Sequence, residues 1–201
     1  MKFQGPASMA RRPFLSVVLV VRNVEDSVGA DVRRLHRHLC ALELSFEIVA
    51  VNGGSRDNSF AVLRLVAAEL PGLSLHPGGL PARAIVRGAA MAQGDLLLLF
   101  DRDPAQEHGV TGAQAGGVPS LAPLGWALSR LERGRQAVVL RGRFLLARRL
   151  PVLPVIVRAR GRGAAFERSF EREAHSLLVD VAGRRARAAS LFAPVLRLLA
   201  V

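Results

Sequence analysis

Residues 94–103 read Gly-Asp-Leu-Leu-Leu-Leu-Phe-Asp-Arg-Asp. The five apolar residues from Leu96 to Phe100 are too few to cross a membrane and too few for a free-standing helix. A continuous apolar run of this length is typical of a strand buried on both faces, which is the strand type of a parallel α/β sheet. Asp101 and Asp103 follow it. Because ligands of open parallel sheets bind beyond the carboxyl ends of the strands, these two acids lie where chemistry is expected.

The two acids indicate a metal site. Mg²⁺ and Mn²⁺ prefer oxygen ligands, and they often take only one or two carboxylates while phosphates and water complete the coordination. We therefore predict that Asp101 and Asp103 hold a divalent cation that in turn holds a diphosphate. The alternative, from these residues alone, is a polar turn that ends the strand and leaves both acids solvated.

The preceding sequence alternates between strand and helix patterns. Four segments have the composition of strands: Phe14–Val21, Phe46–Val51, Leu73–His76 and Leu96–Phe100. Apolar residues at helical spacing lie between them, over 28–42, 62–70 and 84–91. This order is typical of right-handed βαβ units. We therefore expect an α/β fold in one domain, with a mostly parallel sheet flanked by helices.

Side-chain oxygens near the strand ends predict helix caps. Asn23 is expected to cap the first helix, with Asp26 in its first turn, and Asp57 or Asn58 the second. Residues 1–13 are predicted to be a loose lead-in, and 104–119 a loop beside the acidic pair. The later segments are expected to be a helix over 121–134, a strand over 136–140, a short element at 144–147, breaks at Pro151 and Pro154, a helix over 164–176, a strand over 177–181 and an apolar tail over 191–201.

The composition limits the classes of binding partner that we expect. The net charge of +12 suggests an anionic partner, but Lys2 is the only lysine, aromatic residues make up 5% and tyrosine is absent. Stacking platforms for single-stranded nucleic acid are therefore scarce, and we do not expect a nucleic-acid binder. Nucleotide phosphates or an acidic membrane surface explain the charge equally well. Cys40 is the only cysteine, which predicts a reducing, cytoplasmic setting. The positive charge is compatible with a peripheral position on the inner face of the membrane.

Read together, these motifs resemble the family 2 glycosyltransferases of the GT-A fold, which is Rossmann-like, and particularly the branch that transfers sugars to polyprenyl phosphate. Residues 16–23 resemble the family's first strand and Asn-Glu turn, and 47–57 its second strand with the Asp-Asp-Gly-Ser-x-Asp turn. Residues 88–95 resemble the helix that ends in Ala-x-Gly-Asp, and 101–103 the metal-binding Asp-x-Asp motif. Residues 142–149 and 163–167 are similar to later family segments.

The resemblance implies a metal-assisted, inverting transfer from a nucleotide-diphosphate sugar to an acceptor hydroxyl or phosphate, with Mg²⁺ or Mn²⁺ as cofactor. It implies that residues 14–103 form the nucleotide-sugar-binding half and 104–201 a shortened acceptor half of the same domain. Its nucleotide-sugar site would include the following residues: Asn23, Glu25, Asn52, Ser55, Asp57 and Asp101. A hydroxyl acceptor needs a carboxylate base. The candidates, none fixed by spacing, are Asp103, Glu107, Glu167 and Glu171.

The departures from the family pattern are specific. Asn52 and Gly53 stand where the family has two acids, and Arg22 stands where an aromatic residue is usual. Ser169 stands where the family's later glutamate would align, with Glu167 and Glu171 as neighbouring substitutes. The rival hypothesis is therefore a glycosyltransferase-like domain that has lost catalysis and acts as a binding or regulatory module.

Overall fold

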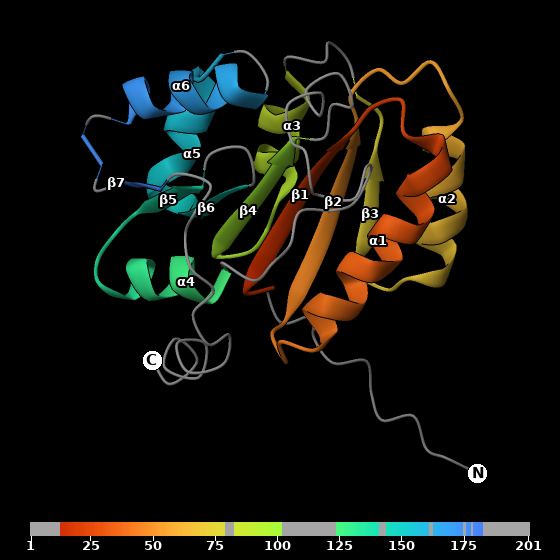
Figure 1. The fold of residues 1–201 in the computed structure, drawn as a ribbon, viewed down its shortest axis with the longest axis horizontal. Helices are drawn as coiled ribbons and strands as arrows, with labels where there is room; N and C mark the ends of the chain where they lie inside the picture. The colour runs from red at the N-terminus through yellow and green to blue at the C-terminus, as the bar shows by residue number, and fades with distance from the viewer. Residues whose placement is uncertain are drawn as a thin grey trace.

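A seven-stranded sheet in the order β3-β2-β1-β4-β6-β5-β7 forms the centre of the computed structural model (Figure 1). The structure describes residues 13–78, 83–101, 124–140, 144–160, 163–174, 176–177 and 179–182. Its strands are β1 (Leu15–Val21), β2 (Phe46–Asn52), β3 (Leu73–His76), β4 (Leu96–Asp101), β5 (Ala137–Leu140), β6 (Phe144–Arg148) and β7 (Val179–Ala182). Its helices are α1 (Glu25–Cys40), α2 (Ser59–Glu69), α3 (Ala84–Met91), α4 (Leu124–Glu132), α5 (Arg149–Arg158) and α6 (Gly163–Glu173).

The first four strands are parallel, and their order reverses once. From β1 the chain moves outward through α1, β2 and α2 to β3, and then returns through α3 to place β4 on the other side of β1. The register pairs Val17 with Ile48 on one side and with Leu98 on the other. The carboxyl ends of β1 and β4 therefore meet at a topological switch point, where open α/β sheets bind ligands.

The sheet is mixed, because β6 runs antiparallel to both β4 and β5, while β7 is parallel to β5. Since strands from both halves of the chain share this one sheet, the predicted single α/β domain with a mostly parallel sheet is confirmed.

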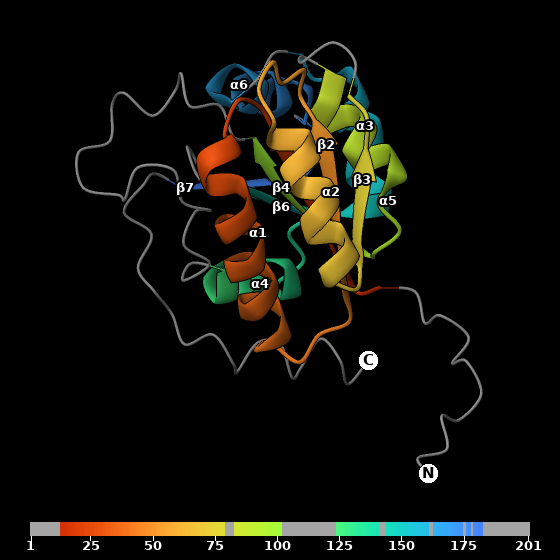
Figure 2. The ribbon, with the colours of Figure 1, turned by 90° about the vertical axis from the view of Figure 1, so that its right-hand side faces the viewer.

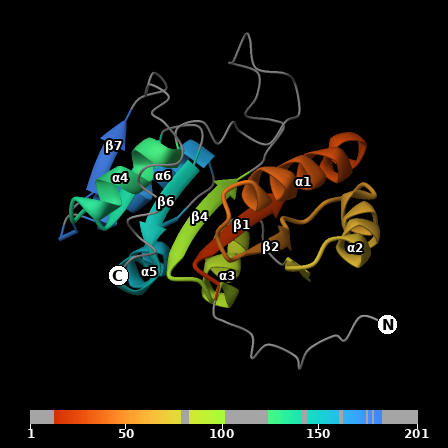
Figure 3. The same cartoon turned by 90° about the horizontal axis from the view of Figure 1, so that it is seen from below.

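Helices cover both faces of the sheet (Figures 2 and 3). Side chains of α1, α2 and α4 form one buried cluster with alternate strand residues such as Leu98, and side chains of α3, α5 and α6 form the other with the intervening residues such as Leu97. Residues 96–100 are all buried, at no more than 2% exposure. The predicted two-sided burial of this strand is confirmed, since its neighbours in sequence contribute to opposite cores.

The predicted break at Pro151 and Pro154 is wrong, because both prolines lie inside α5. Pro151 is the third residue of the helix, where no intrahelical N–H bond is needed. Pro154 removes one interior hydrogen bond, yet the helix continues because it buries three apolar side chains against the sheet: Val152, Val155 and Ile156. The other later elements are present as expected, with small shifts of their ends. The predictions for 1–12, 104–119 and 191–201 fall outside the described residues.

Candidate functional site

The ends of three adjacent strands define the candidate site. Val20 of β1 is in register with Asp101, the last residue of β4, and Val21 is in register with Asn52, the last residue of β2. The loops that leave β1 and β2 therefore start beside the acidic end of β4, at the upper edge of the sheet in Figure 1. Asp101 is thus placed where the sequence predicts a ligand site, while Asp103 and Glu107 lie outside the described residues.

Hydrogen bonds join the β1–α1 loop to the β2–α2 loop. The Asn23 N–H donates to Ser55 Oγ at 3.2 Å, and the Arg56 N–H donates to Asn23 Oδ1 at 2.8 Å. Within the second loop, Asn52 Oδ1 accepts from the Gly54 and Ser55 N–H groups, at 3.1 and 2.8 Å. The side-chain oxygens of Asn23, Ser55 and Asn52 thus hold backbone in place.

A reciprocal pair of carboxylates joins the starts of the two helices that follow. The Glu25 N–H donates to Asp57 Oδ2 at 3.1 Å, and the Asn58 N–H donates to Glu25 Oε2 at 2.6 Å. Asp57 Oδ1 accepts from the Ser59 N–H and hydroxyl at 3.1 and 2.6 Å, and the Val24 N–H donates to Ser59 Oγ at 2.8 Å. Backbone N–H groups at the starts of α1 and α2 thereby find partners across the two loops.

These contacts show that the predicted cap of α1 is wrong and that Asp57, one of the two residues predicted for α2, is the residue whose side chain caps it. Asn23 does not cap α1, whose N-cap position is Val24. It has a positive φ of 49° and its side chain bonds the other loop instead. Of the two residues proposed for α2, Asp57 holds the first N–H of the helix, whereas Asn58 makes no side-chain capping bond. Asp26 lies in the first turn of α1, as predicted.

The same contacts stabilise the charged form of Asp57. Burial acts to raise the pKa of this carboxyl, but hydrogen bonds from the Ser59 hydroxyl and from the backbone N–H groups of Ser59 and Glu25 outweigh it, so its pKa lies below the ordinary value. Since the folded pKa is depressed, this stabilisation is present at pH values above the unfolded pKa and is lost as the pH falls through the folded one.

Asp57→Ala is expected to lower the free energy of unfolding by about 1–2 kcal/mol at neutral pH, because backbone N–H groups at two helix starts lose their acceptor. The difference from wild type should narrow as the pH falls through the folded pKa of Asp57. Urea unfolding from neutral to acid pH measures both effects. The matched control is Asp26→Ala, which removes an exposed acid from the first turn of α1 and should cost about 0.5 kcal/mol. An equal loss in both variants would contradict the capping role.

Gly53, which replaces a family acid, packs tightly against the end of β1. Its N–H donates to the Val21 carbonyl at 2.7 Å, and a Cβ there would lie 3.1 Å from Val20 Cγ1 and 3.2 Å from that carbonyl oxygen. Gly78, which follows β3, lies directly against the last residue of β2, since a Cβ on it would overlap the Asn52 carbonyl oxygen. Sequence reasoning missed Gly78 and Ser59, because both act through partners far away in the chain.

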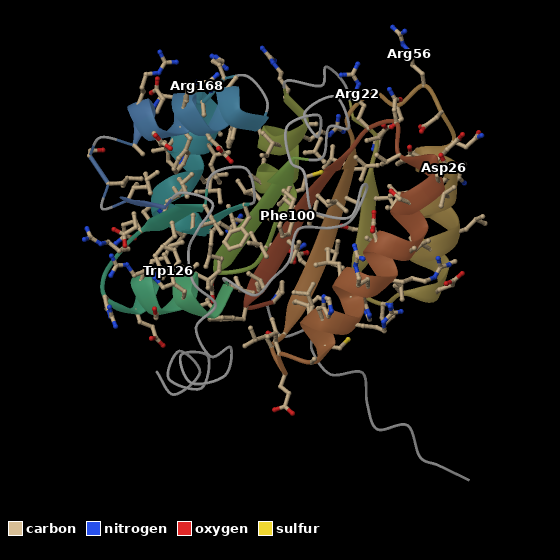
Figure 4. The ribbon with its side chains drawn as sticks, viewed as in Figure 1. Arg22, Asp26, Arg56, Phe100, Trp126 and Arg168 are labelled. Carbon is tan, nitrogen blue, oxygen red and sulfur yellow. The ribbon has the colours of Figure 1, made fainter. Side chains whose placement is uncertain are left out.

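Arginines line the same edge of the molecule. Arg22, Arg56 and Arg168 all lie along it (Figure 4). Arg22 follows β1 directly, and its Nε is buried with no hydrogen-bond partner within the described part of the chain. The Arg22 side chain as a whole is only partly buried, and a guanidinium is a donor suited to an anionic ligand.

Glu167 and Glu171 lie on α6, whose ribbon is at the upper edge of the molecule, the edge where β4 ends, in two perpendicular views (Figures 1 and 2). Both side chains are half-buried. Ser169 between them is 5% exposed, and its hydroxyl accepts from the Arg160 N–H at 2.9 Å, which fastens α6 to the end of α5. Ser169 therefore has a structural contact that accounts for it.

Of the two predicted metal ligands, Asp101 ends β4 and Asp103 lies outside the described residues. No group of three or more His, Cys, Asp or Glu that could hold a metal occurs within the described ranges. A site there would use the carboxylates of Asp101 and Asp103 together with phosphate and water, which is an accepted arrangement for Mg²⁺.

Comparison with solved structures identifies the class of fold. A mannosyltransferase from Pyrobaculum calidifontis, in complex with GDP-Man and Mn²⁺, matches with a TM-score of 0.62 at 15% identity over 91% of this chain and 58% of that one. Glucosyl-3-phosphoglycerate synthase from Mycobacterium tuberculosis matches with a TM-score of 0.56 at 15% identity over 94% and 78%. The fold is the GT-A glycosyltransferase fold, as predicted.

Sequence comparison finds similar proteins for the first half of the chain. Residues 16–105 match the family described as glycosyl transferase family 2. Undecaprenyl-phosphate 4-deoxy-4-formamido-L-arabinose transferases match over 94 residues: the one from Shewanella sediminis at 31% identity and the one from Pseudomonas paraeruginosa at 36%. The match covers 45% and 44% of this chain, which spans only 28% and 27% of those relatives. The predicted resemblance to polyprenyl-phosphate sugar transferases of family 2 is thus confirmed for this first half.

None of the helices in the described ranges is both long enough and apolar enough to cross a bilayer.

Proposed function

We propose that this domain binds a nucleotide-diphosphate sugar and a divalent cation at the carboxyl ends of β1 and β4, and transfers the sugar, with inversion, to an acceptor. The observation that carries the proposal is the switch point, where Asp101 ends β4 in register with Val20, two residues before Arg22. Residues 14–103 would form the donor half and 104–201 the acceptor half.

Donor binding would divide between the cation and the arginines. Asp101 and Asp103 would hold Mg²⁺ or Mn²⁺, which when bound stabilises the charge that develops on the leaving diphosphate. Arg22, with its buried Nε, would donate to a phosphate oxygen. Asn23, Glu25, Asn52, Ser55 and Asp57 would then act chiefly by fixing the loops around the nucleoside, because their side-chain oxygens already hold backbone N–H groups.

A phosphate acceptor suits this chain better than a hydroxyl acceptor. A phosphate is already anionic and needs no general base, whereas a hydroxyl needs a carboxylate within hydrogen-bond reach. The base for a hydroxyl would have to be Asp103, Glu107, Glu167 or Glu171. The curated relatives are named as undecaprenyl-phosphate transferases, which supports a polyprenyl phosphate at a peripheral membrane contact.

The second candidate function is that of a binding or regulatory module without transferase activity. Gly53 favours it, because the family carboxylate at this position is replaced by a glycine packed against Val20. Asn52 also favours it, because its side-chain oxygen is already shared by two backbone N–H groups.

The test is isothermal titration of uridine and guanosine diphosphates, each with and without Mn²⁺. We expect binding of at least one nucleotide that depends on the metal, since the cation would bridge the acids and the diphosphate. If neither nucleotide binds, although cooperative thermal unfolding shows that the protein is folded, the result would contradict the donor site and favour the inactive module.

A further inference from the structure

One side of α5 is apolar and exposed. Leu150, Pro154 and Val157 recur at steps of four and three residues, which places them on one face of the helix. Leu150 is 75% exposed and Val157 46% exposed, and Pro151 and Pro154 are exposed beside them. We call these four residues the α5 face. The helix already buries its opposite side, so the fold does not require the α5 face to be apolar.

This pattern differs from that of α1 and α6. The exposed residues of α1 include Asp26, Arg37 and His38, and those of α6 include Arg168 and Arg172, as is usual for a helix that faces water. In α5 the charges stand only at the two ends, at Arg149 and Arg158. An exposed apolar patch with a charged rim marks an interaction site.

The charges around the α5 face are mostly positive. Arg87 of the neighbouring helix α3 is exposed, and so is Arg160 just after α5. Arg158 pairs with Glu173 at 3.2 Å, but both side chains are about half exposed, at 56% and 41%, so the pair is weak and easily exchanged. Together with a net charge of +12, this rim is complementary to an anionic surface.

The backbone of α5 also fits a lipid headgroup region. Pro154 has no N–H, so the Leu150 carbonyl lacks its helical donor and requires water or a polar group. A helix that lies flat at the headgroup level keeps that carbonyl hydrated while its apolar side chains reach the acyl boundary. A dry protein interface would leave this carbonyl without a donor.

We propose that the α5 face docks on the surface of an anionic lipid bilayer. Since β6 is antiparallel to β4, α5 starts at the amino end of β4 and runs toward the edge with the candidate site, where α6 lies (Figure 1). Val157 is therefore the residue of the α5 face closest to that edge, and Arg158 follows it at the end of the helix. In this way docking would bring a lipid-borne phosphate acceptor toward the site, and this last step rests on the proposed function.

Flotation with vesicles tests the surface directly. Wild type should bind vesicles of phosphatidylcholine and phosphatidylglycerol in equal parts more strongly than vesicles of phosphatidylcholine alone. The double variant Leu150→Asp/Val157→Asp should lose binding to the anionic vesicles by about tenfold or more, because two apolar anchors become acids. The matched control is Leu65→Asp, which changes a leucine that is 70% exposed on α2, in the layer on the other face of the sheet, and should stay within about twofold of wild type.

Three results would overturn the proposal: no flotation of wild type, equal flotation of wild type and the α5 double variant, or an equal loss in Leu65→Asp. Sedimentation that shows a wild-type dimer, dissociated by the α5 variant, would assign the face to a second copy and also overturn it. Titration of nucleotide without lipid separates the two proposals. A wild type that floats but binds no nucleotide would retain the membrane surface and reject the donor site.

Discussion

Asp103→Asn is expected to weaken metal-dependent binding of a nucleotide diphosphate by about 100-fold or more, since even outer-shell partners of a metal contribute 10–100-fold. In the sequence, Asp103 comes two residues after Asp101, which is the last residue of β4. The end of β4 lies at the switch point of the sheet. The amide keeps the size of the side chain and removes the charge that the cation requires. The free energy of unfolding should change by less than about 0.5 kcal/mol, as for most surface substitutions.

The matched control is Asp95→Asn. Asp95 is an exposed acid that precedes β4 at the opposite end of the strand, so the substitution removes the same charge far from the candidate site. We expect it to leave metal-dependent binding unchanged in the same titration. Equal weakening by both substitutions would mean that the overall charge of the domain, and not a local metal site, governs binding. A large loss of stability in Asp103→Asn with binding preserved would assign that acid a structural role.

Local patterns were sufficient to predict the first half of the fold. Two patterns specify both the type of element and its buried side: the apolar run of β4, and the apolar stripe of α1, formed by Val28, Val32, Leu35 and Leu39. All these residues are buried. The position of Asp101 at the edge of the sheet follows from the same reasoning, because the buried apolar run of this strand ends at Phe100 and Asp101 comes directly after it.

Long-range contacts account for what local patterns missed. Asn23 is a good helix cap by residue type, but its side chain bonds Arg56, 33 residues away, and no local signal reveals that partner. The two prolines of α5 are helix breakers by propensity, yet burial of Val152 and Ile156 against the sheet outweighs one missing hydrogen bond. The antiparallel insertion of β6 beside β4 is likewise a non-local pairing that alternation of strands and helices cannot specify.

Leu98→Ala is expected to have the opposite profile to Asp103→Asn, because it removes scaffold and leaves the candidate site. Leu98 is 0% exposed, and its strand neighbours are Val17 of β1 on one side and Leu146 of β6 on the other. Truncation leaves a cavity in the core between the sheet and the helices α1, α2 and α4, so the free energy of unfolding should fall by about 2–5 kcal/mol. Urea unfolding measures the loss, with an unchanged denaturant slope if the variant still unfolds in two states.

The exposed Leu65 provides the control for this substitution as well. Leu65→Ala removes the same atoms from a side chain that is 70% exposed, so it should cost less than about 0.5 kcal/mol. A loss well under 2 kcal/mol in Leu98→Ala would contradict the central position of β4. Such a small loss of stability would also remove the physical basis for placing the donor site at the end of β4, where Asp101 lies. Metal-dependent nucleotide binding by Leu98→Ala, measured at a temperature where the variant is still folded, should match that of wild type, since the side chain lies in the core, away from the edge at which β4 ends.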